Sequence, residues 1–189
     1  MKTLVLDGSS AGDAFADSVW AAIGGAGEAK GLVPDRLLLR DMKIAPCLGC
    51  FGCWIKTPGQ CVIDDEGREV CRRIVGSELV IYSTPVAFGG YSGILKNALD
   101  RSIPNISPMF RYVKREVHHQ KRYSKYPRLL AIGWLPVSEL DQEDTFELLI
   151  QRNALNMHAP KASALVLQTS TQGDALSAAV DGALQEVIG

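Results

Sequence analysis

The feature that most constrains the fold of this chain is a regular alternation of short apolar runs with longer segments of helical periodicity. Runs such as "LVIYS" and "LLAIGW" are apolar at every position, which is typical of strands covered by helices on both faces of a sheet. The alternation predicts an α/β fold with a doubly wound, five-stranded parallel sheet in the order 2-1-3-4-5. The predicted strands are Lys2–Asp7, Val33–Arg40, Leu79–Ser83, Leu129–Leu135 and Ala162–Gln168. The predicted helices are 15–29, 66–76, 93–101, 143–157 and 174–188.

The alternation indicates a single domain over residues 1–189, because the chain shows no internal repeat, low-complexity tract or linker. One segment interrupts the alternation of strands and helices. Residues 102–128 show little regular pattern and are rich in basic side chains, so we expect an irregular excursion with a functional or interface role.

The charge balance excludes several classes of protein. The net charge is −1, so an excess of positive charge for nucleic acid is lacking. The N-terminal apolar stretch is too short for a signal peptide, and no run approaches the length of a membrane span. We therefore expect a cytoplasmic protein with reduced thiols. No Walker loop, G-x-G-x-x-G or Ser-His-Asp order favours a kinase or a hydrolase.

The loop after the third predicted strand is the most informative ligand-binding candidate. In an open parallel sheet, ligands bind beyond the carboxyl ends of the strands. The segment "STPVAFGGYSGILKNALDR" at 83–101 places glycines, aromatic rings and the start of a helix at this edge. Such a loop suits a planar, hydrogen-bonding ring. The loops after the first and fourth strands reach the same edge, and we expect the cysteine-rich loop after the second to do so too.

The tracts "TPVAFGGYSGILKNALDR" and "CLGCFGCWIKTPGQCVIDD" resemble those of flavodoxin-like NAD(P)H-dependent FMN reductases and iron–sulfur flavoproteins. The resemblance implies a flavodoxin-like fold, bound FMN with NAD(P)H as co-substrate, and a homodimer or homotetramer whose neighbouring chain helps to close the flavin site. It places the flavin ring near Thr84, Pro85, Val86, Phe88, Gly89 and Gly90. It places Ser9 and Ser10 at the phosphate loop.

The phosphate loop departs from the family pattern G-S-x-R-x-x-S-x-T. Here the sequence is "GSSAGDAFA" over residues 8–16, so Ala11 occupies the arginine position. Asp13 adds an acid near the expected phosphate, and its residue type and place favour a helix N-cap. Because backbone amides can hold a phosphate without side chains, FMN stays the favoured ligand.

Four of the five cysteines follow the spacing C-x2-C-x2-C-x7-C between residues 47 and 61. Three thiolates at this spacing can wrap corners of a [4Fe–4S] cluster. Zinc fits the overlapping spacing less well, and free thiols packed in a loop are the third interpretation. By the resemblance, Cys47, Cys50, Cys53 and Cys61 would ligate the cluster, whereas Cys71 reads as a core residue.

The leading hypothesis is an FMN-dependent oxidoreductase that takes hydride from NAD(P)H and reduces a quinone, a flavin or a similar acceptor. Its partners would be a small-molecule acceptor or a redox protein, with no nucleic acid and no membrane. One alternative is an electron-transfer iron–sulfur flavoprotein with a [4Fe–4S] cluster on the four cysteines. Another is a flavodoxin-like binding protein without a cofactor, which the altered phosphate loop motivates.

Overall fold

The computed structural model describes residues 1–113 and 115–189, so Lys114 lies outside the described residues. Five strands form one parallel sheet in the order β2-β1-β3-β6-β7. This is the predicted order 2-1-3-4-5, because β6 and β7 are the fourth and fifth strands of the sheet. The strands are β1 (Lys2–Asp7), β2 (Val33–Leu38), β3 (Leu79–Pro85), β6 (Arg128–Leu135) and β7 (Ala162–Gln168).

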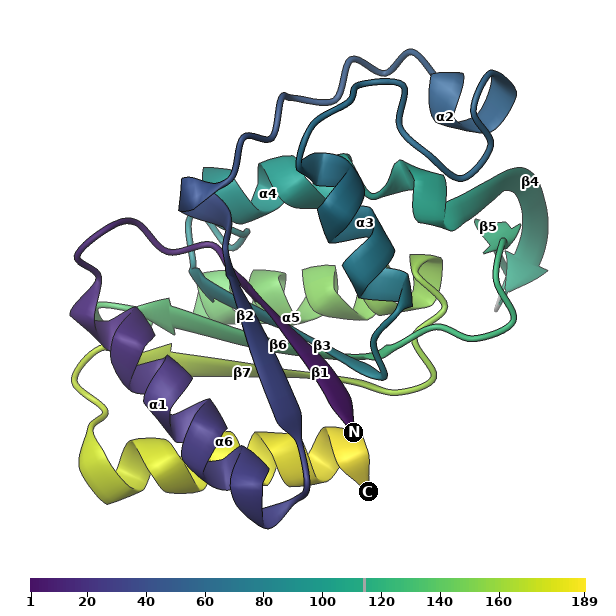
Figure 1. The fold of residues 1–189 in the computed structure, drawn as a ribbon. Coiled ribbons are helices and arrows are strands. Elements are labelled where there is room, and N and C mark those ends of the chain that lie inside the picture. Colours follow the sequence, from purple (N-terminus) through teal and green to yellow (C-terminus); the bar gives the residue numbers. More distant parts are fainter. Residues whose placement is uncertain (114) are drawn as a thin grey trace.

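Helices cover both faces of the sheet, as the apolar strands require (Figure 1). On one face lie α1 (Ala14–Ala29) and α6 (Gly173–Ile188), and on the other lie α3 (Gly67–Val75), α4 (Gly93–Asp100) and α5 (Leu140–Asn156). Alternate residues of each strand pack into opposite layers. In β3, Val80 and Tyr82 join the core under α4 and α5, while Leu79 and Ile81 join the core under α1 and α6.

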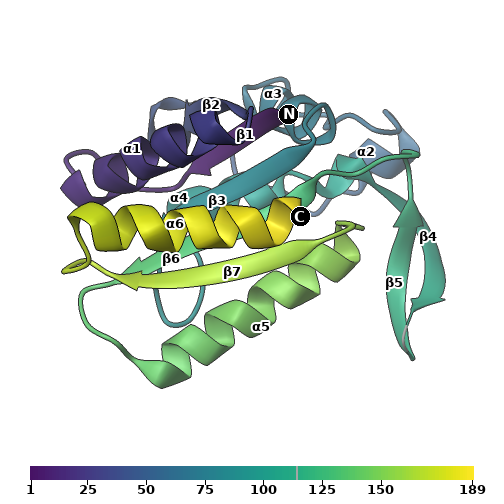
Figure 2. The same ribbon diagram turned by 90° about the horizontal axis from the view of Figure 1, so that it is seen from below.

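The segment predicted to be irregular is folded, which corrects the prediction for residues 102–128. A short 3-10 turn η2 (Ile103–Asn105) leads into β4 (Ile106–Val113) and β5 (Glu116–Lys121). These two strands pair antiparallel in a separate sheet, with a register shift between Ile106 and Phe110. Figure 2 shows the hairpin standing clear of the five-stranded sheet. Strand periodicity is weak here because most of the hairpin's side chains are not buried in a core.

The cysteine-rich segment between β2 and α3 contains two short helical turns. A 3-10 turn η1 (Leu39–Asp41) follows β2 directly, and one turn of helix, α2 (Gly52–Ile55), carries Cys53. Among the described helices, none combines the length and the apolar character needed to cross a bilayer.

Candidate functional site

The loop after β1 is built around a buried carboxylate. Asp7 ends the strand at 1% exposure, and its Oδ1 accepts hydrogen bonds from the backbone N–H (2.8 Å) and the hydroxyl (2.6 Å) of Ser9. Ser9 is fully buried. Its hydroxyl therefore shapes the loop from beneath, and only the exposed Ser10 of the two predicted phosphate-loop serines faces solvent.

Asp13 is the N-cap of α1, as its residue type predicts. One carboxylate oxygen accepts from the backbone N–H groups of Phe15 and Ala16, both at 3.1 Å. The two amides that would otherwise face an anion at this helix end are thus already paired. A phosphate at this loop has to be held by other groups.

The three residues before Asp13 supply such groups. The N–H groups of Ser10, Ala11 and Gly12 donate to no acceptor within residues 1–113 and 115–189. All three residues are exposed at the carboxyl edge of the sheet. Consecutive unpaired amides in a turn form an anion-binding concavity. On this observation the loop fits a phosphate group, although it lacks the arginine of the family pattern.

Two arginines that the sequence reasoning missed reach this loop from β2 and η1. The Nε and Nη2 atoms of Arg36 lie 2.8 Å and 2.6 Å from Oδ2 of Asp7, so the two residues form a largely buried ion pair. Arg40 donates from Nη1 to the hydroxyl of Ser9 at 3.0 Å. The available signal was the strand order: β2 lies beside β1, so a basic residue just after β2 reaches the loop after β1.

The loop after β3 presents the predicted ring-binding residues in two groups. Thr84 is fully buried: its hydroxyl accepts from the Ser92 N–H (3.0 Å) and donates to the Pro85 carbonyl (2.9 Å). Val86 is buried and donates its N–H to the Trp134 carbonyl at 2.9 Å. Thr84 and Val86 therefore anchor the loop, and the half-buried Pro85 lies between them.

The tip of the same loop is a tight turn. Ala87 and Gly90 exchange two backbone hydrogen bonds of 3.0 Å and 2.9 Å, and the turn leaves the Phe88 side chain 99% exposed. Gly89 has φ +73°, and a Cβ there would lie 2.6 Å from the Thr145 side chain on α5. Only glycine fits this position without strain. The turn thus offers an accessible aromatic ring in the loop after β3.

The two loops are locked together through Gly8. Its N–H donates to the Ser83 carbonyl at 2.8 Å, and its carbonyl accepts from the Ser92 hydroxyl at 2.6 Å. A Cβ on Gly8 would lie 2.6 Å from the Cβ of Leu95, so α4 approaches the backbone closely. Free amides on one loop and an open aromatic turn on the other fit a planar ring that carries a phosphate.

The four candidate cluster ligands are not arranged as a ligand set. Cys47 and Cys50 are exposed, Cys61 is half-buried and Cys53 is buried. Over the described part of the chain, no group of three or more His, Cys, Asp or Glu side chains is placed to hold a metal ion. Burial, and next the neighbouring thiol of Cys61, raise the pKa of Cys53. In this arrangement the cysteines do not fit a [4Fe–4S] cluster, and we derive no chemistry through one.

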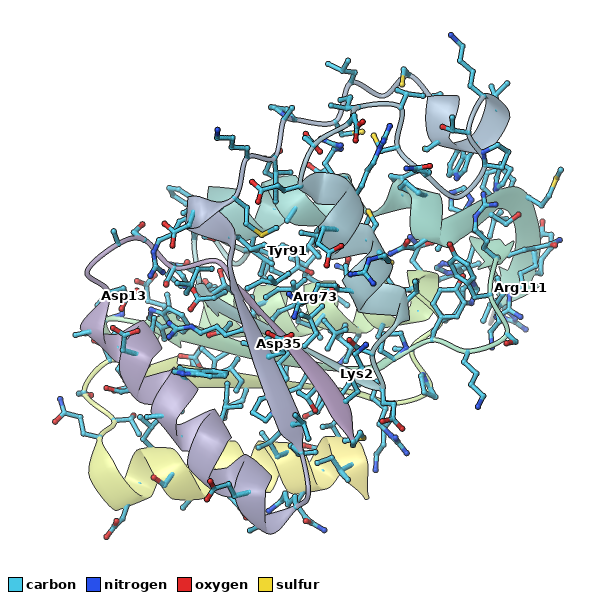
Figure 3. All side chains as sticks on the ribbon, viewed as in Figure 1. Lys2, Asp13, Asp35, Arg73, Tyr91 and Arg111 are labelled. Atoms are coloured by element: carbon cyan, nitrogen blue, oxygen red, sulfur yellow. The ribbon has the colours of Figure 1, made fainter. Side chains whose placement is uncertain are left out.

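The cysteine segment also lies away from the expected edge, which corrects a further prediction. The segment leaves β2 at the carboxyl edge but then runs along α4: Asn97 donates to the Ile44 carbonyl at 2.8 Å (Figure 1). Midway, at α2, it reaches the hairpin, where the Trp54 indole N–H donates to the Ile106 carbonyl at 3.1 Å. Figure 3 shows Asp13 and Arg111 of β4 on opposite sides of the molecule. The cysteines therefore lie towards the hairpin, away from the loop after β1 that carries Asp13.

Arg101, directly after α4, holds this segment in place. The side chain is only 1% exposed. It makes a two-pronged ion pair with Asp65, 2.8 Å for each prong, and donates to the Ala45 carbonyl at 2.6 Å. These hydrogen bonds from Arg101 hold the pKa of Asp65 below its usual range. One guanidinium thus joins both ends of the cysteine segment, and Asp65 binds both Arg101 and the backbone N–H of Gly67 (3.0 Å) at the start of α3.

Comparison with known proteins supports the features above. The family model described as NADPH-dependent FMN reductase matches residues 1–120, which include the loops after β1 and β3. Curated relatives include iron–sulfur flavoproteins of Methanocaldococcus jannaschii (36% identical over 75 residues) and Methanosarcina thermophila (31% over 74). The matches span 40% and 39% of this chain, and 38% of the length of each relative.

Solved structures with the same fold include an NAD(P)H:quinone oxidoreductase from Methanothermobacter marburgensis. It is 14% identical with a TM-score of 0.70, over 98% of this chain and 93% of that one. An FMN-dependent NADH-azoreductase from Bacillus anthracis in complex with FMN is 13% identical with a TM-score of 0.66, over 98% and 99%. At these identities the likeness shows the fold alone, whereas the family model covers most of the sequence. The chain therefore belongs to the NADPH-dependent FMN reductase family of oxidoreductases.

Proposed function

We propose that this protein is an FMN-dependent oxidoreductase that takes hydride from NAD(P)H and passes electrons to a quinone, a flavin or a similar acceptor. The observation that carries the proposal is the family match over residues 1–120. The locked pair of loops at the carboxyl edge supports it. Their free amides and open turn fit a phosphate and a planar ring, and this is the edge at which α/β sheets bind ligands.

The protein's part in this reaction is binding and placement. A bound flavin would supply the hydride and electron transfer itself. The amides of Ser10, Ala11 and Gly12 would hold the phosphate, and the turn at Phe88 would lie against the ring. Thr84 keeps the turn fixed through its two internal hydrogen bonds. No side chain needs to act as an acid or a base at this edge.

The exposed turn also motivates a proposal on assembly. A flavin held against a 99% exposed Phe88 would be open to water on one side. We expect a second copy of the chain to cover this side in a homodimer or homotetramer, with a small-molecule acceptor or a redox protein as electron partner. Light scattering on the purified protein, at concentrations from micromolar upward, measures the assembly directly. A strict monomer with bound FMN contradicts this part of the proposal.

The primary test combines binding with turnover. The full chain is purified, titrated with FMN by flavin fluorescence quenching, and assayed for NADH and NADPH oxidation with a quinone and with free FMN as acceptors. Phe88→Ala should raise the FMN Kd about 2- to 10-fold, since an aromatic contact is worth about 0.5–1.5 kcal/mol. Leu148→Ala, an exposed apolar residue on α5, is the control and should change nothing. Absence of both FMN binding and NAD(P)H oxidation contradicts the proposal and favours a cofactor-less binding protein.

A second candidate function is that of an iron–sulfur flavoprotein. The four-cysteine spacing and the iron–sulfur flavoproteins among the relatives favour it, whereas the positions of the thiols in this structure do not. Anaerobic purification followed by iron and acid-labile sulfide analysis decides the matter. About four irons per chain, lost in Cys61→Ser and kept in Cys71→Ser, would establish the cluster. A protein with flavin absorbance and no iron rejects it.

A further inference from the structure

We propose that Arg40 replaces the missing loop arginine and supplies the positive charge that makes this site select a phosphate-bearing flavin. The inference rests on the proposed function, because it concerns how FMN would be held. The sequence places Ala11 at the arginine position of the phosphate loop. The structure brings Arg40 to the same loop from η1, where its Nη1 donates to the buried hydroxyl of Ser9 at 3.0 Å.

The guanidinium of Arg40 makes no hydrogen bond to a carboxylate among the described residues. Asp7, the nearest acid, already accepts two hydrogen bonds from Ser9 on one oxygen and contacts Arg36 at 2.6 Å and 2.8 Å with the other. Its distance to Arg40 is 4.0 Å. Within the described residues, the Nε and Nη2 groups of Arg40 donate no hydrogen bond. They are free to pair with a ligand oxygen.

The surroundings of Arg40 direct it towards an anion. The side chain is 21% exposed, so part of it is open to solvent. The unpaired amides of Ser10, Ala11 and Gly12 belong to the loop that Arg40 contacts through Ser9. A guanidinium beside amide donors is a strong phosphate partner, because hydrogen bonds between charged groups are shorter and stronger than neutral ones. Asp13 already pairs with the amides at the start of α1, so a phosphate in this loop would depend more strongly on Arg40.

The test compares two ligands that differ only in the phosphate. Dissociation constants of FMN and riboflavin are measured by fluorescence quenching for the wild type, Arg40→Ala and Arg40→Gln. In wild type FMN should bind more tightly than riboflavin. In both variants this preference should fall about 10- to 100-fold, the loss expected for one charge-assisted hydrogen bond, with the riboflavin Kd unchanged. The matched control is Arg73→Ala, which should keep the preference for FMN. Arg73 is exposed to a similar degree, 20%, but pairs with Asp35 on β2 (Figure 3).

The other outcomes each decide against the inference. If the wild type binds FMN and riboflavin equally, or if both Arg40 variants keep the preference, the phosphate is held without Arg40 while the flavin function stands. If the variants weaken both ligands equally, Arg40 acts through loop structure alone. If the wild type binds neither flavin, the proposed function fails with it. If both variants fail to fold, the salt dependence of the wild type decides: the FMN Kd should rise with salt and the riboflavin Kd should not.

Discussion

Arg101→Met is the substitution that tests the architecture of the cysteine segment most directly. The guanidinium is 1% exposed and binds Asp65 through two hydrogen bonds of 2.8 Å and the Ala45 carbonyl at 2.6 Å. Removing one partner of a buried ion pair costs about 3–5 kcal/mol, since the other charge is left uncompensated. Asp65 keeps backbone N–H donors at Ala45 (2.9 Å) and Gly67 (3.0 Å), which favours the lower end, about 3 kcal/mol.

A loss of this size is large beside a typical stability of about 5–15 kcal/mol. For a chain of this length it corresponds to a fall in Tm of about 6–12 °C. Urea unfolding should show a lower midpoint with an unchanged slope. Lys96→Ala is the control on the same helix: its ion pair with Asp100 is exposed and worth about 0–1 kcal/mol. A loss below about 1 kcal/mol in Arg101→Met would refute the reasoning.

The same pair predicts a pH dependence. The folded pKa of Asp65 is lowered, chiefly by its hydrogen bonds to Arg101. Its contribution to stability is therefore fully present above the ordinary pKa of an aspartate, about 3.9, and is lost as pH falls through the lower folded value. Wild type should lose stability steeply below about pH 4, and Arg101→Met should lose less over the same range. The free energy of unfolding of both proteins is measured in urea at pH 5 and pH 3. An equal loss of stability in the two proteins between these pH values would count against the ion pair.

Two further predictions concern the turn and the thiols. Gly89→Ala should destabilise the protein by about 1–3 kcal/mol and weaken FMN binding, because φ is +73° and the new Cβ meets Thr145. Gly24→Ala in α1 has open space around the new Cβ and should instead raise the stability in thermal unfolding by about 0.5–1 kcal/mol. Alkylation followed by mass spectrometry should label the exposed Cys47 rapidly and Cys71 only on unfolding, since Cys71 is buried and burial raises its pKa to about 12. Fast labelling of Cys71 in the native protein would contradict its buried position.

The sheet could be predicted from sequence because the apolar composition of its strands reflects their burial between two layers of helices. β3 is buried along nearly its whole length and reads as a continuous apolar run, and β7 spans the predicted residues 162–168. The hairpin could not be predicted in this way. Its strands β4 and β5 show mostly exposed or half-buried side chains, so no burial periodicity marks them, and Pro108 within β4 argues against a strand.

The position of the cysteine segment could not be derived from its own residues. A loop after β2 is expected at the carboxyl edge, and the segment does begin there. Its course is set by partners far along the chain, Asn97 and Arg101 on and after α4, and Ile106 beside Trp54. The burial of Arg101 could not be predicted for the same reason: a basic residue at the end of a helix normally favours solvent, and only the folded segment covers it.

The loop after β1 lacks the arginine of the family motif, yet Arg40 of η1 contacts the same loop through Ser9. Reading residues 8–16 alone, the loss of the arginine and the presence of Asp13 argue against an anion. The strand order places the residues after β2 beside this loop, so a basic side chain at position 40 can take up the same task. Local motif matching counts residues along one loop, whereas binding depends on the donors that converge in space. The loop amides and the guanidinium of Arg40 are such donors, and under the proposed function they would hold the phosphate of FMN.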